Sequence, residues 1–285
     1  MSPSRNIDQK QISCWEKNRK RLVQKADWVT REEPLEIRLV FGPADQRVQQ
    51  ALAVTMRSPG QDRELAAGFA LTEGIISSPE EVEQLKHRSS FQQSPEENLL
   101  EIHLIPGVSV EWQQLERHFY TTSSCGVCGK ASLEAVATQL PPTLPAPAWR
   151  IPADVLTKLP DSLRRTQSAF QQTGSIHATA SFNTRGELLH LFEDVGRHNA
   201  MDKLIGHALL HHQLPLRKQI LLVSGRLSFE LVQKALMAGA ECLAAIGAPS
   251  SLAIDLAREN GMTLIGFLKP DRFNVYSGED RILLK

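Results

Sequence analysis

The last third of the chain alternates regularly between short apolar runs and amphipathic stretches, and this alternation constrains the fold more than any other feature. Runs typical of buried strands occupy 220–223, 243–246 and 263–267. The intervening stretches, 228–238 and 250–260, carry apolar residues at helical spacing, and Gly261 follows as glycine often does at a helix end. Strands joined by helices of this length pair in parallel through right-handed crossovers. The sequence therefore predicts an α/β sheet here.

A polar loop follows each of these three strands, at 224–228, 247–250 and 268–272. In a parallel sheet all three emerge at the carboxyl edge, where α/β proteins bind ligands. Two of the loops open helices, whose N-terminal N–H groups favour anions. Basic and hydroxyl side chains add to this positive character; they are Ser224, Arg226, Lys269 and Arg272. We predict a site for an anionic, phosphorylated ligand; the alternative is three ordinary turns with solvated basic residues.

The sequence divides into four segments by composition and pattern. The composition of residues 1–32 predicts a polar, partly disordered arm. We interpret its basic cluster, from Lys17 to Lys25, as solvated and not as a binding patch. Residues 33–140 predict an α+β part, with strands at 35–41, 51–54 and 99–105 and a helix at 62–74. Residues 141–152 contain five prolines and predict a stiff connector. Residues 153–285 form the C-terminal domain, which begins with a predicted hairpin over 176–192.

Composition excludes several classes of protein. The 32 lysines and arginines balance 32 aspartates and glutamates, so no global field attracts nucleic acid. The first thirty residues lack the apolar region of a secretory signal, and no uncharged apolar stretch reaches membrane-spanning length. Four cysteines in a chain of this length do not form a disulfide framework. We expect a cytoplasmic protein with reduced thiols.

The strongest local signal is the motif Cys125-Gly-Val-Cys128, which is flanked by Gly129 and preceded by four hydroxyl residues. Glycines allow a bulky partner to approach the sulfur atoms. Lys130 and a helix predicted to begin near Ser132 would lower a thiol pKa and raise the thiolate fraction. The motif therefore predicts a reactive thiol pair.

Several chemistries use such a pair. Structural zinc needs two further ligands, and zinc deaminases need an upstream H-x-E, which the chain lacks. Thioredoxin-like exchange expects the motif at the end of a strand that opens a βαβ unit, whereas here a predicted helix precedes it. Persulfide carriage fits, because a thiolate must attack a sulfur donor and then present the outer sulfur. The residues alone do not decide among these chemistries.

A second polar concentration is Glu193-Asp-Val-Gly-Arg-His198, between a predicted strand and a helix beginning near Asn199. We expect Asp194 either to orient His198 or to pair with Arg197; helix capping with a local ion pair explains the block equally well. His177, on a predicted strand, is more typical of a structural histidine than of a catalytic one.

Together, these motifs resemble the FdhD family, the accessory sulfurtransferases of formate dehydrogenase. The resemblance runs from about residue 33 to 276. Its blocks are 68–76, 125–129, 193–198 with Asp202 and Lys203, 224–226 with Ser228 and Glu230, and 263–267.

The resemblance implies a fold similar to cytidine deaminases, a homodimer, and transfer of sulfur from a cysteine desulfurase to the molybdenum cofactor. The acceptor would be bis-molybdopterin guanine dinucleotide, before its insertion into formate dehydrogenase, and a guanine nucleotide would occupy the same site. Cys125 would carry the persulfide, with Cys128 as helper or secondary carrier. The implied cofactor-binding residues are Phe267, Leu268, Lys269, Pro270, Asp271 and Arg272, and Ser224, Arg226, His177, Asp194, Arg197 and His198 are pocket candidates. No resident metal is expected.

Three alternatives remain: a cofactor-binding chaperone for formate dehydrogenase in which the cysteines are secondary, a thiol–disulfide oxidoreductase, and a zinc hydrolase.

Overall fold

The computed structural model describes residues 6–88, 98–108, 110 and 144–284. Its larger sheet has six strands in the order β13-β12-β11-β10-β8-β9. The strands are β8 (His177–Asn183), β9 (Leu188–Asp194), β10 (Gln219–Val223), β11 (Cys242–Ala245), β12 (Thr263–Gly266) and β13 (Asn274–Ser277). Strands β10, β11 and β12 pair in parallel and the other pairs are antiparallel. This confirms the predicted alternation and the predicted hairpin.

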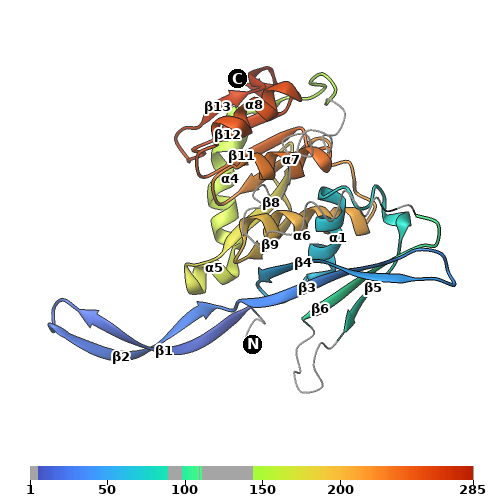
Figure 1. Cartoon of the computed structure of the whole chain (residues 1–285). Coiled ribbons are helices and arrows are strands. Elements are labelled where there is room, and N and C mark those ends of the chain that lie inside the picture. The colour runs from blue at the N-terminus through green and yellow to red at the C-terminus, as the bar shows by residue number, and fades with distance from the viewer. Residues whose placement is uncertain (1–5, 89–97, 109, 111–143, 285) are drawn as a thin grey trace.

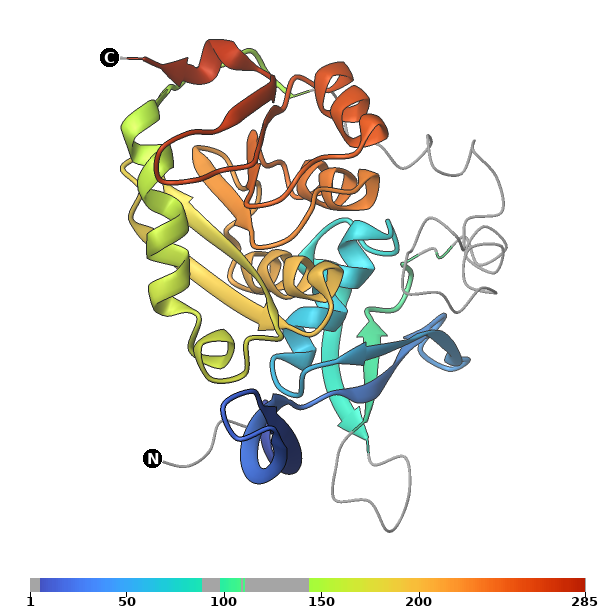
Figure 2. The ribbon, with the colours of Figure 1, turned by 90° about the vertical axis from the view of Figure 1, so that its left-hand side faces the viewer.

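Helices cover both faces of this sheet (Figures 1 and 2). On one face lie α6 (Arg197–Leu210), α7 (Phe229–Met237) and α8 (Ser251–Glu259), and on the other α4 (Ala153–Thr166), followed by α5 (Ser168–Thr173). Alternate residues of β10 separate the two cores: Leu221 faces the larger core and Leu222 the core under α4. Ser228 and Ser250 accept hydrogen bonds from Leu231 N–H and Ala253 N–H, which caps α7 and α8 where the sequence predicts their starts.

The N-terminal part contains a four-stranded sheet in the order β4-β3-β6-β5. Its elements are β3 (Glu33–Phe41), β4 (Val48–Arg57), α1 (Asp62–Thr72), η1 (Pro79–Glu81), β5 (Val82–Arg88) and β6 (Leu99–Leu104). A short pair of strands, β7 (Ile151–Pro152) and β14 (Ile282–Leu283) after η3 (Glu279–Arg281), joins the connector to the C-terminus. These elements confirm the predicted mixed α+β fold; the likeness to cytidine deaminases stays a prediction.

Helix α1 joins the two parts of the chain, because it packs both against the four-stranded sheet and against α6 (Figure 1). The helices meet at two glycines. A Cβ atom on Gly68 would lie 1.9 Å from the carbonyl oxygen of Asp202, and one on Gly206 would lie 1.8 Å from that of Glu64. The backbones therefore touch, and Leu35 of β3 and Leu204 of α6 belong to one continuous core.

Residues 7–30 form an antiparallel hairpin of β1 (Ile7–Glu16) and β2 (Arg21–Thr30), which projects from the body of the protein (Figure 1). The expectation of a partly disordered arm is therefore wrong for this segment. Ile7 is the only buried residue of the two strands, so the sequence shows no core-facing alternation. The base is held where Ile7 packs with Ala169 and Ile176, and where the Thr30 hydroxyl lies 3.0 Å from that of Thr173.

No helix in the described part of the chain is long and apolar enough to cross a membrane.

The glycine contact predicts a large effect of one added methyl group. Gly68→Ala must push α1 away from α6, and overpacking of this kind costs about 3 kcal/mol. Urea denaturation should show this loss in the free energy of unfolding, whereas Arg63→Ala, at an exposed position of the same helix, should stay within about 0.5 kcal/mol. A Gly68→Ala protein as stable as the wild type would contradict the close contact.

Candidate functional site

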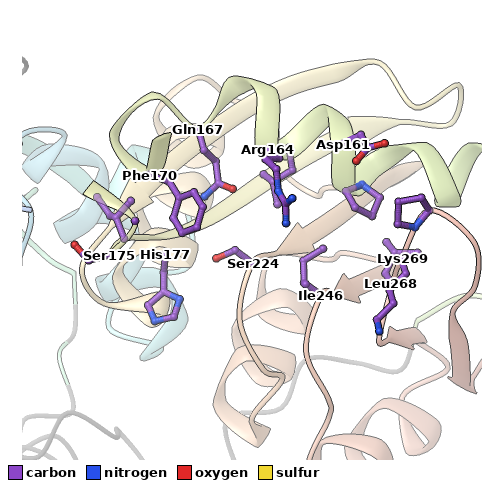
Figure 3. A pocket seen from close by; sticks show the side chains of 15 residues that line it. Asp161, Arg164, Gln167, Phe170, Ser175, His177, Ser224, Ile246, Leu268 and Lys269 are labelled. Atoms are coloured by element: carbon purple, nitrogen blue, oxygen red, sulfur yellow. The ribbon is translucent and has the colours of Figure 1, made fainter. Parts of the chain in front are cut away.

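A cavity of 640 Å³ lies between α4 and the carboxyl ends of the central strands (Figure 3). Strand-end residues of β10, β11 and β12 form one wall, and α4 and α5 form the other. The first wall includes Ser224, Ile246, Leu268, Lys269 and Pro270. This is the edge at which the sequence predicts a site for an anionic ligand.

Glycines bring the strand-end loops together. The N–H of Gly247 donates to the carbonyl of Gly225 at 3.0 Å, and the N–H of Phe267 donates to the carbonyl of Gly247 at 2.9 Å. A Cβ atom on Gly247 would lie 2.8 Å from the oxygen of Gly225. Any larger residue at 247 would separate the loops. The close approach fixes the three loops as one surface.

The loop after β12 turns sharply into the cavity. Phe267 has a φ of 50°, in the left-handed region that phenylalanine rarely adopts, and its side chain is 43% exposed. Leu268, the next residue, is buried. The N–H of Lys269 donates to the carbonyl of Arg272 at 2.8 Å and closes the turn. Strain of this kind persists only where surrounding structure fixes it, and it is concentrated at functional sites.

The wall formed by α4 and α5 contains residues that the sequence did not single out. Figure 3 shows Asp161, Arg164, Gln167 and Phe170 along this wall, with the Arg164 side chain extending toward the strand-end residues. Arg164 and Lys269 place positive charge on opposite walls, against the single carboxylate of Asp161 among the lining residues. The cavity therefore offers two cations, one carboxylate and an aromatic ring.

His177, at the start of β8, borders both this cavity and a second polar cluster at the N-terminus of α6. A Cβ atom on Gly225 would lie 3.4 Å from His177 Nδ1 and 3.7 Å from Arg197 Cδ, so both side chains pack over that glycine. His198 Nε2 lies 3.2 Å from the Ser228 hydroxyl and 3.4 Å from a Glu230 carboxylate oxygen. Arg197 Nε is buried and has no hydrogen-bond partner among the described residues.

Both histidines are kept neutral. Burial and the charge of Arg197 lower the pKa of His177. Burial, followed by the charges of Arg197 and Lys234, lowers the pKa of His198 to about 3. The Glu230 carboxylate close to His198 does not offset these effects. His198 is therefore a neutral hydrogen-bonding group and Arg197 is the charged member of the cluster.

Asp194 neither orients His198 nor pairs with Arg197, contrary to both expectations. It is completely buried and lies 2.7 Å from Nζ of Lys203, a residue of α6. Its carboxylate also accepts from Ser58 N–H at 3.1 Å and from Gly196 N–H at 2.8 Å. The reason is that Lys203 and Ser58 are buried beside it, whereas the Arg197 side chain packs over Gly225. Asp194 therefore holds the loop that carries Arg197 and His198.

The structure brings together part of the predicted set. His177, Ser224, Leu268, Lys269 and Pro270 line the cavity. Arg226, Phe267, Asp271 and Arg272 are exposed on the same loops but do not line it, and Arg197 and His198 lie beyond His177. Cys125 and Cys128 lie outside the described residues. Among the described residues, no three His, Cys, Asp or Glu side chains group as metal ligands would.

Comparison with known proteins identifies the family. Residues 31–283 match the FdhD/NarQ family. The chain belongs to this family. A sulfur carrier protein FdhD of Streptomyces coelicolor is 49% identical over 262 residues, covering 91% of this chain and 90% of the relative. Its counterpart in Streptomyces avermitilis is 50% identical over the same shares. That of Sulfurisphaera tokodaii is 40% identical over 257 residues, covering 90% of this chain and 92% of the relative.

A solved FdhD-type fold agrees with this assignment. The crystal structure of a Desulfotalea psychrophila protein assigned as a formate dehydrogenase accessory protein superposes with a TM-score of 0.72. The two chains are 22% identical, and the match covers 98% of this chain and 100% of the other. At this identity the likeness establishes the fold alone. The hairpin of β1 and β2 precedes the residues that match the FdhD/NarQ family.

The low pKa of His198 predicts a specific dependence of stability on pH. The folded protein keeps His198 neutral down to about pH 3, while the unfolded chain binds the proton near the ordinary pKa of 6.5, so stability falls as the pH drops below 6.5. Between pH 7 and pH 5 this group removes about 2 kcal/mol from the free energy of unfolding. In urea titrations between pH 7 and pH 5, the free energy of unfolding of His198→Gln should fall by about 2 kcal/mol less than that of the wild type.

The control is His212→Gln. The His212 side chain is 69% exposed, and a charge at such a surface position contributes little to the free energy of unfolding. Equal pH slopes for His198→Gln and the wild type would show that His198 takes up its proton in the folded state.

Proposed function

We propose that this protein is a sulfur carrier that serves formate dehydrogenase. The observation that supports this most strongly is identity of 49–50% with two proteins named sulfur carriers, across 91% of the chain. The sulfur would be carried on Cys125 of the motif Cys125-Gly-Val-Cys128 and delivered to the molybdenum cofactor before the cofactor enters the dehydrogenase.

The loading step is a thiol exchange. The Cys125 thiolate attacks the outer sulfur of a cysteine desulfurase persulfide, the donor S–S bond breaks, and the donor cysteine leaves as a thiolate. Cys125 then carries the persulfide. Residues that lower a thiol pKa would favour this step, and Lys130 lies two positions beyond Cys128 in the sequence.

Delivery of the sulfur as sulfide requires two electrons, because the outer sulfur of a persulfide is more oxidised than sulfide. The Cys128 thiol supplies them if it attacks the inner sulfur of the Cys125 persulfide. The outer sulfur then leaves as sulfide for the metal, a Cys125–Cys128 disulfide forms, and the displaced oxygen ligand leaves as water with the two protons. This gives Cys128 the role of helper and requires a thiol reductant to restore the pair.

The cavity between α4 and the strand ends suits one nucleotide arm of the cofactor. Its volume of 640 Å³ falls within the range of small-molecule sites. Arg164 and Lys269 would bind the phosphates from opposite walls, and the Asp161 carboxylate can accept from the two N–H groups on the guanine edge. Phe170 offers a ring on which the base can stack.

In the cell, a cysteine desulfurase would donate the sulfur and formate dehydrogenase would receive the sulfurated cofactor. The protein would work in the cytoplasm as a homodimer. A cofactor-binding chaperone without a sulfur role is the second candidate, favoured by the cavity in which Arg164 and Lys269 suit an anionic ligand.

The first test of sulfur carriage is the mass of the intact protein after incubation with a cysteine desulfurase and cysteine. The wild type should gain one sulfur atom, about 32 Da, which a reductant removes. Cys125→Ala should not gain it, whereas Cys128→Ala should load but fail to release the sulfur as sulfide. A gain that survives both substitutions would refute carriage by this motif, and no gain at all would favour the chaperone.

The cavity is tested with guanosine diphosphate as a probe in isothermal titration calorimetry. Arg164→Ala and Lys269→Ala should each weaken binding about tenfold or more, the usual effect of losing a charged hydrogen bond. Arg165→Ala is the matched control, because Arg165 is the next residue of α4 and does not line the cavity. Equal losses in Arg164→Ala and Arg165→Ala would place the nucleotide elsewhere.

A further inference from the structure

The hairpin of β1 and β2 has two chemically different faces. Its strands pair in register, so Trp15 lies opposite Leu22 and Gln9 opposite Trp28, and paired residues share a face. All ten residues on this first face are uncharged. The charged side chains of both strands lie on the second face. The first face is therefore an uncharged ribbon with a tryptophan near each end.

Large apolar side chains on the first face are exposed to solvent. The exposed fractions are 58% for Trp15, 64% for Leu22 and 42% for Trp28. Trp15 and Leu22 lie next to the tip of the hairpin, which projects away from the rest of the chain (Figure 1). Tryptophan is among the residues that contribute most binding energy at protein interfaces. An exposed pair on an isolated two-stranded ribbon, itself a marginal structure, indicates a surface that a partner covers.

The hairpin is also positively charged. Residues 7–30 contain six lysines and arginines against three acidic residues, a net charge of +3 in a chain whose total is zero. Arg19 pairs with Glu16 at 3.2 Å and Lys10 with Asp8 at 3.7 Å. Lys17, Lys20, Arg21 and Lys25 have no acidic partner among the described residues. Three of these four cations lie at the tip, beside Trp15 and Leu22.

We propose that this hairpin is a docking arm for a partner protein whose surface carries acidic residues around an apolar groove. The groove would receive Trp15 and Leu22, and the acidic rim would face the cations of the tip. Complementary charge of this kind raises the rate of association and fixes its orientation. The arm precedes residues 31–283, which match the FdhD/NarQ family, and its role here is partner selection.

The same observations argue against two other occupants. Two copies of the arm packed on one another would bring +3 against +3, which is repulsive. A lipid surface would bury the amides of Gln9, Gln11 and Gln24, which lie on the tryptophan face and need hydrogen-bonding partners when they leave water. A protein groove supplies such partners and a hydrocarbon layer does not.

The test uses the full-length chain and two purified probes, cysteine desulfurase and cofactor-free formate dehydrogenase; the choice of probes rests on the proposed function. One variant removes the apolar contacts, Trp15→Ser with Leu22→Ser and Trp28→Ser. A second keeps them and reverses charge at the tip, Lys17→Glu with Lys20→Glu. Leu252→Ser is the matched control, since Leu252 on α8 is 63% exposed, as Leu22 is 64%.

Both hairpin variants should bind one of the two probes at least about tenfold more weakly than the wild type, while the control stays within about twofold. Wild-type affinity for that probe should fall as salt rises, and less steeply for the tip variant. If the partner is the desulfurase, loading of Cys125 should need more donor for half-maximal rate and reach the same maximal rate.

Other results overturn the inference. The first is unchanged affinity of both variants for both probes, and the second is a wild type that binds neither probe. The third is a triple variant that sediments as a monomer where the wild type sediments as a dimer. The fourth is binding to anionic vesicles that requires the hairpin. Failure of the proposed function is distinguishable, because it would appear as absent loading in the wild type, whereas failure of the docking inference appears as intact binding and loading in the variants.

Discussion

The contact between α1 and α6 organises the rest of the structure. At Gly68 and Gly206 the two helices touch through their backbones, so the N-terminal sheet and the C-terminal sheet are held in one core. Two buried ion pairs fix the angle and register of this contact. Lys203 of α6 lies 2.7 Å from Asp194 and donates to the carbonyl of Ser58 at 3.0 Å. Lys234 of α7 lies 3.0 Å from Asp202 and donates to the Thr72 hydroxyl at 2.9 Å.

These pairs matter for the site because a buried charge without its partner is strongly destabilising. Asp194 precedes the loop that carries Arg197 and His198, and Lys203 ties that carboxylate to the segment between β4 and α1. The position of the polar cluster therefore depends on residues more than a hundred positions earlier in the chain. The family blocks at 68–76 and 193–198 with Lys203, which look separate in the sequence, meet on the two sides of this contact.

The elements that could be predicted are those whose local signals agree. Over 219–266, strand and helix periods, serine caps and Gly261 all indicate the same elements, and the parallel order follows from them. The hairpin at 7–30 lacked such a signal because both of its faces are solvated. Helix α4 was not predicted, although Leu156, Leu159 and Leu163 recur at helical spacing, because Pro160 inside it is typical of a break.

Because α4 was not predicted, the wall of the cavity that α4 and α5 form was not predicted either. Nothing in the sequence distinguishes Arg164, which lines the cavity, from Arg165, which does not; only the rotation of the helix against the sheet decides. Likewise, the local sequence predicts that Asp194 pairs with its neighbours, whereas its partners are Lys203, further along α6, and Ser58, across the α1 contact. The strand-end loops were predictable because a parallel sheet brings all carboxyl ends to one edge, whatever the details of packing.

The electrostatics of the site separate binding from sulfur chemistry. Burial and Arg197 keep the pKa values of His177 and His198 below their ordinary range, so these rings stay uncharged near neutral pH. The positive charge that would attract phosphates comes from arginine and lysine side chains, and a guanidinium does not lose its proton in proteins. Protonation of these two rings should therefore not change anion binding between pH 7 and 8. A free thiol, in contrast, titrates near about 8.5. Any steep pH dependence of sulfur transfer near neutrality would then arise from the thiols and not from the cavity.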